Sequence, residues 1–241
     1  MNNILTICTK EFKSYLTSPM AYIITAAFLL GTGFFFALPQ ETSAAYAETS
    51  MRGVFANTFY IIIVLLLMAL VTMRMISEEK KLGTIELLMT APVKDSELII
   101  GKYLGSVGLM IMMLVFTIYY PIMLFVFGDP DPGPIFGGYL GLFLLSCLAL
   151  AVGIFTSSLT SNQLVAAVVA GAILLGLWFL NSFAALMPTS IANVLSYFSP
   201  ASYVPDFYTG VIDTRGIIYF ISATALFLFL AVRSLENSRW N

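Results

Sequence analysis

The strongest constraint on the fold is a long run without charge: residues 132–205 contain no Asp, Glu, Lys or Arg. A helix crosses a bilayer with about 20 apolar residues, so this run is too long for one membrane helix. Polar residues at 156–158 and 161–163 divide it into two spans. With the other apolar stretches, the sequence predicts six spans, at about 20–38, 53–73, 99–127, 135–159, 164–186 and 216–232.

Composition supports the same class of protein. The 241 residues are 59% hydrophobic and 10% charged, whereas a soluble domain usually carries about 25% charged residues. We therefore predict an all-α integral membrane protein with a single transmembrane domain over residues 1–241. The net charge of −2 gives no reason to expect a nucleic-acid partner, and two distant cysteines without any histidine make a disulfide framework or a metal site unexpected.

The basic residues predict the orientation of these spans. Six spans place both termini on one side, and basic residues gather in cytoplasmic segments. With the termini inside, nine of the eleven basic residues are cytoplasmic and only Arg52 and Arg215 lie outside. The nine are Lys10, Lys13, Arg74, Lys80, Lys81, Lys94, Lys102, Arg233 and Arg239.

Residues 1–18 are amphipathic rather than a signal peptide, because their polar lead is too long. This pattern is typical of a helix lying in the cytoplasmic interface, and Ser18-Pro19 favours a bend before the first span. Glu11 falls inside the apolar arc, where an unpaired acid is costly, so we expect it to face a Lys or Arg of the cytoplasmic loop or of a partner protein, or to reach backbone donors. The apolar arc consists of Ile4, Leu5, Ile7, Cys8, Phe12, Tyr15 and Leu16.

The charged block at residues 74–102 holds ten of the chain's 24 charged residues and must lie in water between two spans. Gly83 is expected to end a helix, and Thr84 to cap a short lateral helix with Glu86 in its first turn. Pro92 would end that helix. Its apolar face would be formed by Ile85, Leu87, Leu88 and Met89.

A second helix is predicted to follow this short one. Asp95 or Ser96 can cap it, with Glu97 in its first turn. The block therefore predicts a helix end, a lateral helix, a sharp turn and a new helix.

The block carries a resemblance to a known family. SEEKKLGTIELLMTAPVKDSELIIGKYLG resembles the first cytoplasmic loop of permeases of the ABC-type type-2 exporter class, in which a charged stretch, GT-x-E-x-L, a proline and a GK pair form the coupling helix. VTMRMISEEKKLGTIELL is most similar to the gliding-motility branch of that class.

The resemblance implies a function and partners. Residues 76–98 would be the cytoplasmic coupling loop that docks on an ABC ATPase dimer, which binds ATP and Mg²⁺ itself, so no cofactor is expected in this chain. Residues 1–18 would be the elbow helix. The chain would pair with a second copy or a paralogue in the bacterial cytoplasmic (inner) membrane, with an auxiliary exoprotein as a further candidate partner. The implied docking residues are Glu79, Gly83, Thr84, Glu86, Leu87, Leu88 and Pro92, and the implied elbow residues are Lys10, Glu11 and Phe12.

The outer connection at residues 188–213 is rich in Ser, Pro and aromatic residues, and its apolar stretches are too short to span. It is open to two interpretations. It could form a partly re-entrant pair of helices, as in the resembled permeases, or an aromatic belt at the interface.

Other functions have less support. No ionisable residue lies at the middle of a predicted span, which argues against a proton-coupled carrier. No phosphate-binding G-x-x-x-x-G-K-[ST] loop occurs, so ATP hydrolysis is expected in a separate subunit. The pairs Gly101/Gly105 and Gly137/Gly141 favour close helix packing. Two alternatives to an exporter remain open: a bundle that relays ATPase motion to an outer partner without cargo, and a passive membrane anchor.

Overall fold

The computed structural model describes residues 2–38, 46–84, 94–128 and 130–238, which form helices and their connections without a strand. This confirms the all-α class. In chain order the helices are α1 (Asn2–Thr17), α2 (Pro19–Ala37), α3 (Tyr46–Ala56), α4 (Thr58–Thr72), α5 (Ser77–Lys81), α7 (Asp95–Thr117), α8 (Tyr119–Phe127), α9 (Pro132–Leu159), α10 (Gln163–Ala184), α11 (Thr189–Phe198), η1 (Pro200–Ser202), α12 (Val204–Tyr208) and α13 (Thr214–Ser238).

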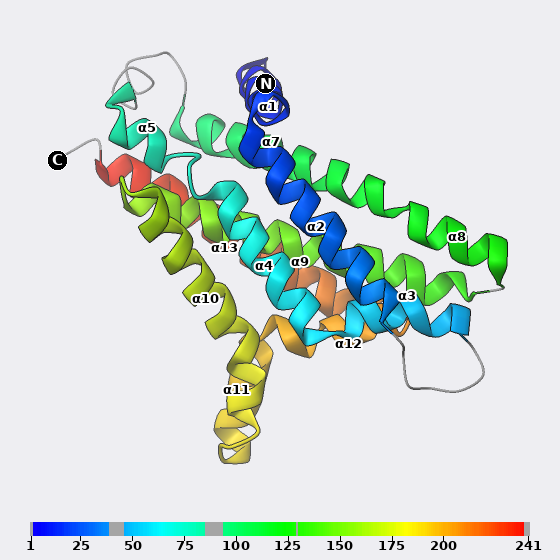
Figure 1. Ribbon diagram of the computed structural model, residues 1–241. Helices are drawn as coiled ribbons and strands as arrows, with labels where there is room; N and C mark the ends of the chain where they lie inside the picture. Colours follow the sequence, from blue (N-terminus) through cyan, green and yellow to red (C-terminus); the bar gives the residue numbers. More distant parts are fainter. Residues whose placement is uncertain (1, 39–45, 85–93, 129, 239–241) are drawn as a thin grey trace.

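Among the described residues, six helical segments are long and apolar enough to cross a membrane. Both chain ends and α5 lie at one end of the bundle, whereas α3, α11 and α12 lie toward the other (Figure 1). The six segments are Pro19–Ala37, Thr58–Lys81, Asp95–Phe127, Pro132–Leu159, Gln163–Ala184 and Thr214–Asn237.

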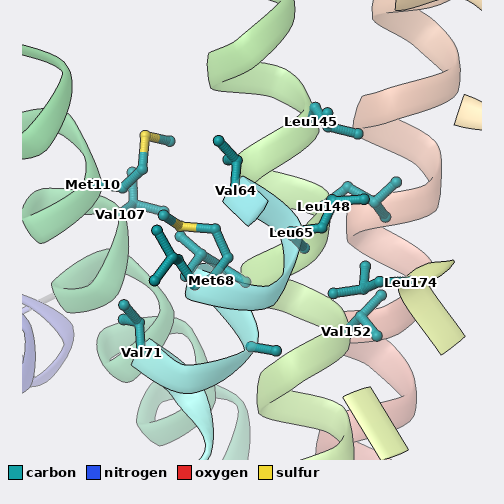
Figure 2. Packing of buried hydrophobic residues seen from close by; sticks show 14 of the residues in the cluster. Val64, Leu65, Met68, Val71, Val107, Met110, Leu145, Leu148, Val152 and Leu174 are labelled. Carbon is teal, nitrogen blue, oxygen red and sulfur yellow. The ribbon is translucent and has the colours of Figure 1, made fainter. Parts of the chain in front are cut away.

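The core forms around α4 and α9, which are mostly buried, while α2, α10 and α13 expose much of their apolar surface. A helix that is apolar all round suits the centre of a bundle in lipid, because no polar face needs water. Figure 2 shows side chains of four helices meeting there. The labelled residues are Val64, Leu65, Met68 and Val71 of α4, Val107 and Met110 of α7, Leu145, Leu148 and Val152 of α9, and Leu174 of α10.

The second span begins later than the predicted residue 53. Residues up to Ala56 belong to α3, and Asn57 caps α4 by accepting hydrogen bonds from the backbone N–H groups of Phe59 (2.9 Å) and Tyr60 (3.3 Å). An Asn cap satisfies amides that a helix start leaves unpaired. A new helix therefore begins within the stretch that the sequence predicted to be one continuous span.

The third span is broken at Ile118, between α7 and α8, three residues before Pro121. Proline has no N–H to bond with the carbonyl of residue 117, so the helix opens in the turn before it. The Tyr139 hydroxyl of α9 donates to the Thr117 carbonyl at 2.9 Å. The kink is therefore held by a contact between helices.

The outer connection forms α11, η1 and α12. The α12 side chain Phe207 is buried against Gly141 of α9, where an added Cβ would lie 2.7 Å from the Phe207 Cβ. Gly137 lies against the same residue. The predicted role of this glycine pair in close packing is therefore confirmed. Whether this connection re-enters the membrane or lies at its surface stays a prediction.

Candidate functional site

The central feature of the candidate site is Lys102, a charged residue that is 2% exposed. Its Nζ lies 2.8 Å from Glu11 Oε1 and 2.8 Å from Glu79 Oε1. The three residues belong to α7, α1 and α5, so one ammonium group joins three helices at the end of the bundle where the chain termini lie (Figure 1). The expected pairing of Glu11 with a basic residue is confirmed, with Lys102 as the partner.

Glycines of α7 bring α1 close enough for this pairing. An added Cβ at Gly101 would lie 2.8 Å from the Ile7 Cβ, and one at Gly105 would lie 2.7 Å from the Glu11 Cβ. Both distances are shorter than van der Waals contact, so only glycine fits. The predicted packing role of Gly101/Gly105 is confirmed, and it delivers the Glu11 carboxylate to Lys102.

The group formed by Glu11, Glu79 and Lys102, which we call the Lys102 triad, has a formal charge of −1. The acids are about one-fifth exposed, at 17% and 19%. Of the described polar atoms, Glu79 Oε2 is one of two buried side-chain atoms without a hydrogen-bond partner. A hydrogen bond stabilises a buried carboxylate oxygen, because it offsets the loss of contact with water. This oxygen is therefore suited to accept a hydrogen bond from another molecule.

Arg74 ties the bend between α1 and α2 to the end of α4. Its Nη2 donates to Ser18 Oγ at 2.8 Å, and its guanidinium carbon lies 5.7 Å from the Tyr15 ring centroid. The Tyr15 hydroxyl donates to the Val71 carbonyl at 3.0 Å. Burial, and to a lesser degree the Glu11 carboxylate, raises the pKa of Tyr15, so the hydroxyl remains a donor at physiological pH.

Ser157 of α9 fixes the joint between α4 and α5. Its Oγ accepts from the backbone N–H groups of Ile76 (3.1 Å) and Ser77 (3.0 Å) and donates to the Met73 carbonyl (3.0 Å). Lys80 of α5 donates to the Ser158 carbonyl at 2.5 Å. The backbone groups freed at the joint are thus satisfied by α9, and α5 is attached to the bundle core.

A polar cavity of about 450 Å³ opens beside these contacts. Basic and acidic side chains of α1, α5 and the ends of α4 and α7 line it together, including both acids and the lysine of the triad. Mixed charge, amphipathic walls and hydrogen-bond donors suit contact with a polar protein surface better than passage of an apolar molecule. The lining includes Lys10, Glu11, Tyr15, Arg74, Glu78, Glu79 and Lys102.

Residues 36–233 match the model of the ABC-2 family transporter proteins, a stretch that covers most of the chain and all of α3 to α12. The chain belongs to the ABC-2 family. No curated protein matches the sequence. An ABC-2 protein is the membrane-spanning, non-catalytic subunit of an ABC transporter, and the six apolar helices agree with a multi-pass membrane protein.

The predicted docking residues of this ABC-2 protein are only partly described. Gly83 follows α5 with φ of +70°, a conformation that glycine adopts without strain, so the expected helix end is confirmed. The Thr84 hydroxyl donates to the Glu79 carbonyl at 3.3 Å. The segment predicted to form the lateral helix, with Glu86, Leu87, Leu88 and Pro92, lies outside the described residues, so the docking assignments stay predictions.

The elbow residues of this ABC-2 protein divide between two faces of α1. Glu11 and Phe12 face α7, where Phe12 contacts Gly108, whereas Lys10 is exposed. Leu5 and Leu16 of the predicted apolar arc are 62% and 36% exposed, so they are not buried against α7. That the arc faces the membrane interface stays a prediction.

The predicted cap of α7, Asp95 or Ser96, was one or two residues late, because the cap is Lys94. The helix begins at Asp95, so Lys94 precedes it, and the Lys94 N–H donates to the Glu97 carboxylate at 3.3 Å. Glu97 does lie in the first turn, as expected. An acid at this position accepts a hydrogen bond from the backbone N–H of the residue before the helix. This bond fixes the helix start although no cap side chain accepts a bond there.

Sequence reasoning did not single out Lys102 or Ser157 as site residues of this ABC-2 protein. Lys102 did carry a signal, because it is a lone charge flanked by Gly101 and Gly105 at the start of an apolar run. Ser157 carried none beyond its place in a polar interruption, since its partners lie 80 and 81 residues away in the chain.

Proposed function

We propose that this chain is the permease subunit of an ATP-driven exporter and that a separate cytoplasmic ATPase dimer drives it through the loop at residues 76–98. The observation that carries the proposal is the Lys102 triad, which joins α1, α5 and α7 beside that loop. The ATPase supplies the binding sites for ATP and Mg²⁺, and this chain supplies the surface that receives its motion.

The contacts around the loop support a lever. Glu79 connects α5 to α7 through Lys102, and Ser157 connects the start of α5 to α9. A displacement of the loop would therefore tilt α4 and α7 as rigid, packed helices. It would not be absorbed by bending at a flexible hinge. Packed helices have discrete arrangements, which suits a transporter that alternates between two states.

The assembly proposed here is a dimer in the bacterial inner membrane. Both termini would be cytoplasmic, because that orientation places nine of eleven basic residues inside. A second copy or a paralogue would supply the other wall of the transport path, since α2 and α10 expose apolar surface that one bundle does not cover.

A second candidate function is the relay of ATPase motion to an outer partner without cargo, as the resemblance to the gliding-motility branch suggests. The supporting observation is α11, which lies with the outer end of α10 beyond the rest of the bundle (Figure 1). Ile191, Val194 and Tyr197 of α11 are exposed and would form the surface that contacts the outer partner. An auxiliary exoprotein is a candidate for that partner.

The test uses Glu86→Arg and Thr84→Ala, purified with the cognate ATPase. The charge reversal opposes a helix N-terminus and inverts the charge offered to the partner, and the alanine removes a cap of about 1 kcal/mol. We expect normal insertion with weaker co-elution or altered ATP turnover, most severely for Glu86→Arg.

The matched control is Glu236→Arg, an equal charge change on exposed α13 at the same end of the bundle. It should leave co-elution and turnover at wild-type values. If both loop variants also behave like wild type, the loop is not the docking element and this proposal fails.

A further inference from the structure

A second large groove lies away from the Lys102 triad, along the exposed side of α13. Its volume is about 900 Å³, and α9, α10 and α11 form its other walls. It begins at Arg215, near the start of α13, and reaches Phe227 in the middle of that helix. The start of α13 lies at the end of the bundle opposite the chain termini (Figure 1).

The length of the groove matches one leaflet of a bilayer. Arg215 and Phe227 are twelve positions apart on one helix, which corresponds to about 18 Å. Half of the hydrocarbon core of a bilayer is about 15 Å thick. Arg215 therefore lies at the level of the lipid head groups when Phe227 lies near the bilayer centre.

The walls of the groove are apolar and fixed. Leu148 of α9 is buried and forms part of the floor. The rings of Tyr203 and Tyr219 are stacked with centroids 4.6 Å apart, and the Tyr219 hydroxyl donates to the Phe198 carbonyl at 2.6 Å. The aromatic wall is therefore in place before any ligand arrives, which reduces the entropy lost on binding.

The polar chemistry of the groove is concentrated at one end. Arg215 is exposed, and within the described residues its guanidinium forms no salt bridge. The nearby Asp213 carboxylate instead accepts the Arg215 backbone N–H at 2.9 Å. A guanidinium presents paired donors that fit the oxygens of a phosphate.

We propose that this groove binds one phospholipid of the leaflet opposite the chain termini, with its phosphate on Arg215 and an acyl chain along α13 toward Phe227. The groove offers one cation at head-group level and an apolar channel as deep as a leaflet. The site is separate from the Lys102 triad, so it does not depend on the proposed coupling to an ATPase.

The test measures lipid binding to the purified full chain in detergent by native mass spectrometry, with phosphatidylglycerol and with a diacylglycerol of the same acyl chains. Arg215→Ala should weaken binding of phosphatidylglycerol about tenfold, because it removes a charge-assisted hydrogen bond. Binding of the uncharged diacylglycerol should not change. Arg52→Ala, which removes the other predicted outer cation, should leave both lipids at wild-type affinity.

A second pair of variants tests the acyl channel. Ala223 lines the groove, whereas Ala225 is exposed on the same helix and is not part of the lining. Ala223→Phe should weaken both lipids at least fivefold, and Ala225→Phe should weaken neither. The two substitutions add the same volume to one helix, and the thermal unfolding midpoint of each variant in detergent separates a loss of folding from a loss of binding.

Three results would overturn the proposal. These are unchanged phosphatidylglycerol binding in Arg215→Ala, equal wild-type affinity for the two lipids, and disulfide dimers formed in membranes by Ser222→Cys in a background with Cys8 and Cys147 replaced by serine. The last result would mean that a second copy of the chain, rather than a lipid, covers the groove.

Discussion

Lys102 pairs with two carboxylates that are only about one-fifth exposed. Both distances are 2.8 Å, and the lysine is almost fully buried. A buried ammonium group without a partner is costly, so the pairs with Glu11 and Glu79 stabilise Lys102 in this position. Because this one ammonium group binds a carboxylate from each helix, the positions of α1 and α5 are coupled although the two helices are far apart in the sequence.

Replacing Lys102 by methionine should be strongly destabilising. The side chain keeps its apolar volume but leaves two partly buried carboxylates facing each other, which should cost about 2–4 kcal/mol. We expect a lower midpoint of thermal unfolding in detergent, and partial recovery when Glu11→Gln and Glu79→Gln are added.

The control for this change is Arg233→Met, which breaks the exposed pair between Arg233 and Glu236 at 2.9 Å. An exposed pair contributes little, so its loss should cost less than about 1 kcal/mol. Equal effects of the two substitutions would show that the Lys102 triad does not depend on burial for its contribution.

The contact between α1 and α7 depends on small residues at the crossing. Gly101, Gly105 and Gly108 face Ile7, Glu11 and Phe12 in turn, so the backbones approach closely along one stripe. The attachment of α1 is therefore a property of this stripe as a whole rather than of a single pair.

Gly105→Val should separate the two helices. The added Cβ would lie 2.7 Å from the Glu11 Cβ, and such overpacking typically costs about 1–3 kcal/mol. The variant should also accumulate at a lower level in membranes, which quantitative immunoblotting would detect. Gly176→Val is the matched control, because no atom lies within 4 Å of an added Cβ there. A Gly105→Val protein as stable as the control would contradict the packing role of the stripe.

At the scale of the whole molecule, α1, α5 and the end of α13 lie at one end, whereas α3, α11 and α12 lie at the other (Figure 1). The basic residues that the structure describes follow the same division, since only Arg52 of α3 and Arg215 at the start of α13 belong to the end opposite α5. Charge and architecture therefore agree on which connections face the same compartment.

This arrangement predicts the labelling of single cysteines placed in a protein without Cys8 and Cys147. Cysteines at positions 48, 131 and 213 should react with an impermeant reagent from outside the cell. Cysteines at positions 81 and 239 should react only after permeabilisation. Outside access at position 81 would reverse the orientation and with it the proposed contact to a cytoplasmic ATPase.

The sequence by itself determined the class, the number of spans, the helix end at Gly83 and the need of Glu11 for a polar partner. These follow from hydrophobicity, glycine conformation and the cost of burying a charge, which are local properties of the chain. It also predicted the close packing at Gly101 and Gly105, because small residues at this spacing face one side of a helix.

Only the tertiary structure decided which residues meet. Lys102 and Glu11 are 91 positions apart, Ser157 binds amides 80 and 81 positions away, and Arg215 lies at the mouth of a groove whose walls come from four helices. Each of these contacts depends on how the helices cross, and helix crossing is set by the mutual fit of side-chain surfaces that no single segment of the sequence contains.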